Sequence, residues 1–114
     1  MAAIVRPTPR LDLMKGTLAL LILRTLELEP RHGVAIADRI QQTTRGTFLV
    51  RPGSLFPALH RLEQDGAIAG DWSIVDGRRI KTYRLTAAGR RQLASGTRDW
   101  ARLVEAMRLV LDTE

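Results

Sequence analysis

The sequence predicts a mainly α-helical fold with one small β-hairpin and a long C-terminal helix. After Pro52, three leucines recur at the spacing of one helix face: Leu55, Leu59 and Leu62. Two strand-like runs follow, and Asp76-Gly77 between them is a strong signal for a two-residue hairpin turn. The end of the chain repeats apolar residues every seven positions, which is typical of a helix that packs against another helix. A helix with one buried face, trailed by a basic hairpin, is the layout of a winged helix-turn-helix.

Length and composition restrict the class of protein. With 114 residues, the chain is expected to form one small domain with a modest core. It contains no cysteine, which excludes a disulfide framework and thiolate metal sites. It has no run of eighteen apolar residues and no secretory-signal pattern at its start, so we expect no membrane contact and a cytoplasmic location.

The formal net charge of +6 is concentrated in the middle of the chain. Residues 45–91 carry nine Lys or Arg against four Asp or Glu, a net charge of +5. Residues 1–44 have a net charge of +2, and residues 92–114 have a net charge of −1. Clustered positive charge favours a polyanionic partner, because neutralised phosphates release their counterions. For any single basic residue, the alternative that it only solvates the surface stays open.

The N-terminal part is predicted to hold an arm and two helices. Residues 1–10 contain two prolines and are expected to form a flexible arm. Asp12 can cap a first helix that runs to about Leu28, shortly before a proline. This helix is apolar over much of its circumference, so we expect its own domain and a second subunit to bury it. Gly33 opens a second helix, and residues 43–50 form the turn into the third.

The third helix is predicted to begin at Pro52 and to end at Gly66. Proline is accepted in the first turn of a helix, because the N–H groups there have no hydrogen-bond partner within the helix. Pro57 is tolerated because it lies near the helix start. Opposite the leucine stripe we place small or basic residues, which allow close approach to another molecule: Ser54, Ala58 and Arg61.

The two strands are predicted over residues 67–75 and 78–85, and they complete a DNA-binding domain that spans residues 11–86. Trp72 and Tyr83 are expected to pack in the core and across the hairpin, because strands are stabilised by such cross-strand pairs.

Thr86 caps a last helix that runs to about Leu111, and residues 87–114 are predicted to form a dimerisation helix. A helix of about 25 residues is roughly 38 Å long, which is longer than the core of so small a domain needs. Its heptad pattern therefore predicts packing against another helix, and a second copy of the chain is the simplest partner. The predicted dimer interface comprises apolar residues of the first and last helices: Leu13, Met14, Leu93, Trp100, Leu103, Val104, Met107, Val110 and Leu111. The alternative, that this helix folds back wholly on its own domain, stays open.

Three segments, in this order, resemble the PadR family of bacterial transcriptional regulators. They are His32-Gly33-Val34-Ala35-Ile36-Ala37, then Pro52 to Glu63, then Tyr83-Arg84-Leu85-Thr86-Ala87-Ala88-Gly89. The resemblance extends from Leu11 to Leu111 and is to the short single-domain members, similar to those of Acidobacteria and relatives. It implies a winged-helix dimer that usually represses neighbouring genes or its own gene, sometimes until a small aromatic ligand releases it. Val34 and Phe56 stand where the family usually has tyrosines, so the hydrogen bonds of those hydroxyls are not carried over.

The residues and the resemblance together predict a sequence-specific DNA-binding regulator, a dimeric repressor that recognises a pseudo-palindromic operator in double-stranded DNA. The predicted DNA-binding residues are Arg51, Ser54, Ala58, His60, Arg61, Arg78, Arg79 and Lys81. Within this set, the third helix enters the major groove with Ser54, Ala58 and Arg61 nearest the base edges. The two hairpin arginines reach the backbone or the minor groove, whereas Arg51 and Lys81 contact phosphates.

The same residues bear on other classes of function. With two histidines, no cysteine and no metal-ligand spacing, the chain is expected to be no enzyme and to need no metal or cofactor. Trp100 is a candidate to line a pocket for a small aromatic effector, and its alternative is packing in the dimer. The remaining alternative is a winged-helix protein-interaction dimer without sequence-specific DNA binding.

Overall fold

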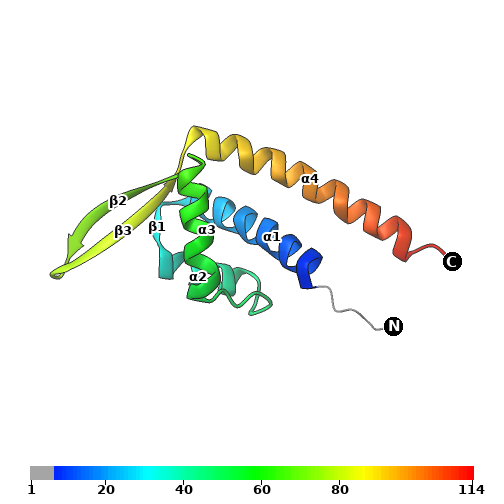
Figure 1. Ribbon diagram of the computed structural model, residues 1–114, viewed down its shortest axis with the longest axis horizontal. Helices are drawn as coiled ribbons and strands as arrows, with labels where there is room; N and C mark the ends of the chain where they lie inside the picture. Colours follow the sequence, from blue (N-terminus) through cyan, green and yellow to red (C-terminus); the bar gives the residue numbers. More distant parts are fainter. Residues whose placement is uncertain (1–6) are drawn as a thin grey trace.

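The computed structural model describes residues 7–114, with side chains from Gly16 onward. Its elements follow in the order α1 (Pro7–Leu28), β1 (Arg31–His32), α2 (Gly33–Thr43), α3 (Pro52–Gln64), β2 (Ile68–Val75), β3 (Arg78–Leu85) and α4 (Ala87–Leu111). The first three helices cluster together, β2 and β3 project from them as a wing, and α4 runs back along α1 (Figure 1). The predicted fold class is confirmed: over residues 7–114, four helices and a small antiparallel sheet form a winged helix-turn-helix with a long C-terminal helix.

Local capping marks the starts of α2 and α4 and the end of α3. His32 precedes α2, and its Nδ1 accepts a hydrogen bond from the amide N of Ala35 at 3.3 Å. The Thr86 hydroxyl caps α4 as predicted, accepting a hydrogen bond from the amide N of Gly89 at 3.0 Å. Gly66 follows α3 with φ of +77°, a left-handed conformation that glycine adopts without a steric penalty.

The sheet has the strand order β1-β3-β2, and both pairings are antiparallel. The turn between β2 and β3 has positive φ at both Asp76 and Gly77, the conformation that favours a two-residue hairpin loop. The short strand β1 was not predicted from the sequence, because two residues are too few to show any alternation. β1 pairs with the base of β3 and ties the start of α2 to the sheet.

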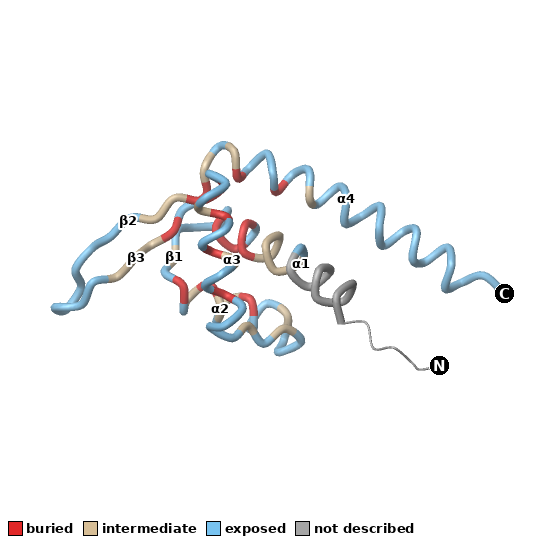
Figure 2. The backbone as a smooth tube through the Cα atoms, in the orientation of Figure 1, coloured by how far each residue is buried: buried red, intermediate tan, exposed pale blue. Residues whose placement is uncertain are grey.

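The core lies where the helices meet the base of the sheet (Figure 2). Each helix contributes one side, and the sheet contributes the inner ends of its strands: Ile22, Leu23, Leu26, Ile36, Ile40, Leu55, Leu59, Leu62, Ala67, Ile68, Tyr83, Leu85 and Leu93. The far part of α4 takes no part in this core and is exposed along its length (Figure 2). The structure therefore agrees with the expectation that α4 is longer than the core of its own domain needs.

The start of α1 differs from the prediction. The helix begins at Pro7 and not after Asp12, so the predicted arm over residues 1–10 is too long. Prolines in a first helical turn cost little, because the N–H groups there have no partner within the helix. Residues 1–6, and the side chains of the predicted interface residues Leu13 and Met14, lie outside what the structure describes.

The close packing of α4 on Ala67, the residue just before β2, gives a stability prediction. An added Cβ at Gly89 would lie 2.0 Å from the carbonyl oxygen of Ala67, a backbone atom that can move only if α4 or the start of the wing moves. We expect Gly89→Ala to lower the free energy of unfolding by about 1–3 kcal/mol or more in urea denaturation. Gly16→Ala is the control, because nothing lies within 4 Å of its Cβ position. Equal stability of the two variants would contradict this packing.

Candidate nucleic-acid interface

α3 has one buried side and one outward side. Leu55, Leu59 and Leu62 are fully buried against α1 and α2, as the leucine stripe predicted. At 100° per residue, the positions opposite this stripe are Gly53, Pro57 and His60, and all three are exposed. Small side chains over the first two turns let the helix backbone come close to whatever it faces.

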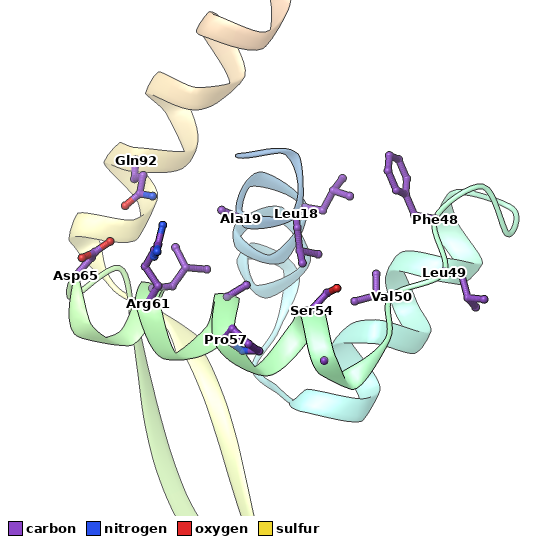
Figure 3. Close-up of a pocket in the computed structure, with 14 residues that line it drawn as sticks. Leu18, Ala19, Phe48, Leu49, Val50, Ser54, Pro57, Arg61, Asp65 and Gln92 are labelled. Atoms are coloured by element: carbon purple, nitrogen blue, oxygen red, sulfur yellow. The ribbon is translucent and has the colours of Figure 1, made fainter. Parts of the chain in front are cut away.

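The predicted reading face is turned sideways from this outward side. Ser54, Ala58 and Arg61 line a hollow of about 390 Å³ together with Gly53 and Pro57 at the edge of the outward side, and its other walls come from α1, residues 48–50 and the start of α4. Ala58 is half-buried and packs against the core, so it cannot lie opposite the leucine stripe. Figure 3 shows Arg61 at one end of the hollow, extending toward Gln92. The prediction that these three residues oppose the stripe is therefore wrong. Three leucines define a line along the helix, and they do not show how far the buried face extends to either side of it.

The other flank of α3 faces the wing. Phe56, His60 and Glu63 follow one another at helical spacing, and Glu63 Oε1 accepts a hydrogen bond from Lys81 Nζ of β3 at 2.8 Å. Phe56 is half-exposed and covers Gly33, where a Cβ would lie 3.0 Å from the Phe56 ring. The outward side of α3 is thus continuous with one surface of the wing.

The wing carries cations that differ in how they are held. Arg78 and Arg79 lie next to the turn and are exposed. Arg84 Nε lies 3.1 Å from Asp71 Oδ2 on the neighbouring strand. The hydrogen bond to Glu63 raises the pKa of Lys81 above its ordinary value, so its ammonium keeps its charge throughout the neutral range. Lys81, for which the sequence predicted a phosphate contact, is bound to Glu63 of α3 in the structure, and its phosphate contact stays a prediction.

The two aromatic residues of the wing have different environments. Tyr83 is buried at the base of the wing, as predicted. Trp72 is 57% exposed, so its predicted place in the core is wrong. It pairs across the strands with Lys81, in the part of β2 from Asp71 onward where every residue is exposed. A pattern of alternating residues gives the face of a strand and cannot tell where along the strand the covering layer ends.

The heptad residues of α4 fall into two groups. Leu93 is 5% exposed and belongs to the core of its own chain, so its assignment to a dimer interface is wrong. From Trp100 onward the apolar residues are exposed, and they form a single seam: Trp100, Leu103, Val104, Met107, Val110 and Leu111. Trp100 is 43% exposed and Leu111 is 73% exposed, a large apolar area for the surface of a water-exposed helix.

Neither a metal site nor a membrane span emerges from the described residues. No group of three or more His, Asp or Glu side chains in that part of the chain could hold a metal ion. Within residues 7–114, no helix is both long and apolar enough to cross a membrane. The two histidines are separate, with His32 at the cap of α2 and His60 on the outward side of α3.

Comparisons with known proteins agree with this architecture. The family model described as "Transcriptional regulator PadR-like family" matches residues 22–95. A transcriptional regulator of Mycobacterium tuberculosis is 45% identical over 71 residues, which cover 62% of this chain and 64% of that protein, less than two thirds of its length. A protein of Lysinibacillus sphaericus is 30% identical over 104 residues, covering 90% of this chain and 95% of the relative. The solved structure of a PadR family transcriptional regulator from Eggerthella lenta matches with a TM-score of 0.81 at 29% identity, covering 94% of this chain and 92% of that chain.

Proposed function

This chain belongs to the PadR-like family of transcriptional regulators, and from that membership we propose that it is a dimeric repressor that binds an operator in double-stranded DNA. The family consists of regulators and not of enzymes, in agreement with the expectation from the sequence. A cytoplasmic location follows from the proposed target. The observation that carries the proposal is the exposed surface that runs from the outward side of α3 to the wing, bordered by the exposed cations Arg61, Arg78 and Arg79.

On this surface, we assign base contacts to α3 and backbone contacts to the wing. His60 lies on the outward side of α3, and Arg61 lies at its border with the hollow, so both can reach base edges when the helix enters the major groove. Ser54 and Ala58 lie further round toward the hollow and are secondary candidates. Arg51, Arg78 and Arg79 are exposed and are proposed to contact phosphates or the minor groove.

The seam of α4 supports the dimer. Six apolar side chains are exposed along it, and a two-fold axis would bring the same residues of a second copy against them. Two subunits would then present two α3 helices to successive half-sites of a pseudo-palindromic operator. We assign Trp100 to this interface first. A small aromatic effector is the second candidate occupant, because Trp100, Leu103 and Met107 line a shallow apolar hollow.

Binding to operator and to random duplex across a salt series tests this function. Arg78→Ala combined with Arg79→Ala should weaken binding to both duplexes alike, because contacts with phosphates carry no sequence information. The log–log salt dependence should flatten by about 0.9 for each phosphate that the variant no longer neutralises. A weakening confined to the operator would show that the wing reads bases, and salt-insensitive binding would contradict the basic surface as the interface.

A further inference from the structure

Trp72 is a large aromatic side chain of the wing that does not pack in the core, so core packing does not account for its presence. It shares one surface of β2 with Ile74, while Ser73 and Val75 alternate onto the other surface. Because the Trp72–Lys81 pair lies on the same side as Glu63 of α3, this surface continues the outward side of α3. An exposed tryptophan here is placed beside the proposed DNA surface.

Two cations contact the Trp72 ring. Lys81 is its direct cross-strand partner, and Lys81 Nζ lies 5.5 Å from the ring centroid. Arg79 pairs with Ile74 and reaches diagonally across the hairpin, so that its Cζ lies 4.5 Å from the same centroid. Both distances fall within the range in which a cation is attracted to the face of an aromatic ring.

These two cations are not equivalent. Lys81 is bound to Glu63, and its Nζ also lies 5.3 Å from the centroid of the buried Tyr83 ring. Gly70 leaves the room for it, since a Cβ at that position would lie 2.2 Å from Lys81 Cε. Lys81 is therefore held between α3 and the sheet, with its Nζ over the Trp72 ring.

Arg79 forms no ion pair with any carboxylate among the described residues. Its guanidinium carbon Cζ lies over the Trp72 ring instead, and no carboxylate in the described part of the chain occupies its N–H groups, which remain donors for a ligand. One ion pair and two cation–ring contacts form a continuous series from α3 outward: Glu63, Lys81, Trp72, Arg79. This series relates the position of one guanidinium near the wing tip to α3.

We propose that Trp72 is a positioning residue, which holds Arg79 in the orientation that contacts the DNA backbone when α3 docks. This inference rests on the proposed DNA-binding function and goes beyond it by giving the wing a fixed contact. An arginine held before binding loses less side-chain entropy on binding than a free one. Removing the indole should then weaken DNA binding even though no base is read by it.

A double-mutant cycle tests the proposal, with a short random-sequence duplex as the probe. Trp72→Ala should weaken binding about two- to fivefold, the range expected from a cation–π contact at an exposed site. Trp72→Phe should retain most of the affinity, because a ring face remains. In the Arg79→Ala background, Trp72→Ala should have no further effect. Val75→Ala, an exposed apolar residue on the other surface of β2, should leave the affinity unchanged.

The results separate this inference from the function on which it rests. If the wild-type protein binds the duplex and Trp72→Ala weakens binding equally with and without Arg79, the indole acts on DNA directly and the positioning account is wrong. If Trp72→Ala has no effect at all, the account is also wrong. A wild-type protein that binds no duplex would overturn the proposed function itself. Trp72 is 57% exposed, so thermal unfolding should be the same for Trp72→Ala and the wild type, and a lost fold then cannot imitate the result.

Discussion

Replacing Trp100 and Leu103 of α4 with aspartate should convert the protein from a dimer to a monomer, or make it insoluble. Both side chains belong to the exposed apolar seam, and a dimer would enclose their replacements in an apolar contact. Each buried and unpaired carboxylate costs on the order of several kcal/mol, so two of them exceed what a small interface can offset. Sedimentation at micromolar concentration measures the change.

A control pair on the same helix isolates the effect of the seam. Ser95→Asp combined with Leu109→Asp adds two aspartates to the side of α4 opposite Trp100, where both wild-type side chains are exposed. This variant should remain a dimer. The monomeric seam variant should also lose operator affinity, because each subunit alone reaches a single half-site. A wild-type protein that sediments as a monomer would show that the assignment of the seam to a dimer interface is wrong.

Arg61→Ala should reduce binding to the operator far more than binding to random duplex. A guanidinium that bonds a guanine edge in bidentate fashion gives about 1–3 kcal/mol of discrimination. In the structure Arg61 extends toward Gln92, so reading a base requires its exposed side chain to turn to the outward side of α3 (Figure 3). Affinities for both duplexes, measured at the same salt concentration, give the discrimination directly.

Two further variants identify which side of α3 reads the bases. Arg98→Ala removes the same charge from α4, away from α3 and the wing, and should change neither affinity by much. If His60→Ala lowers operator affinity and Arg61→Ala lowers both affinities equally, His60 is the base reader. Arg61 would then be a backbone contact.

The order and type of the long elements followed from local sequence signals. Leucine spacing, the Asp76-Gly77 turn and the Thr86 cap each act within a few residues, so each could be recognised without knowledge of the fold. The strand β1 could not be recognised, because its formation depends on pairing with Tyr83 and Thr82, some fifty residues away. Its existence is decided by tertiary contact and not by its own residues.

Two of the errors in the candidate site, at Leu93 and Trp72, have one physical origin. Periodicity shows which residues share a face, but not what covers that face. Leu93 fits the heptad as well as Trp100 does. Yet Leu93 is buried in the core of its own chain, whereas Trp100 is exposed. Trp72 fits the strand pattern, yet the core ends before it. The charge on Lys81 was predicted, whereas its partner Glu63 lies 18 residues away and became visible only in the fold.

The measurement that tests the central claim most directly is footprinting on the DNA upstream of the protein's own gene. We expect one protected site with two-fold symmetry, its half-sites about one helical turn or a multiple of it apart, and protection that declines steeply as salt increases. A protein that is dimeric in solution and protects no part of this DNA, and that binds no duplex even at low salt, would contradict this function. Such a result would identify the molecule as a protein-interaction dimer on a winged-helix scaffold.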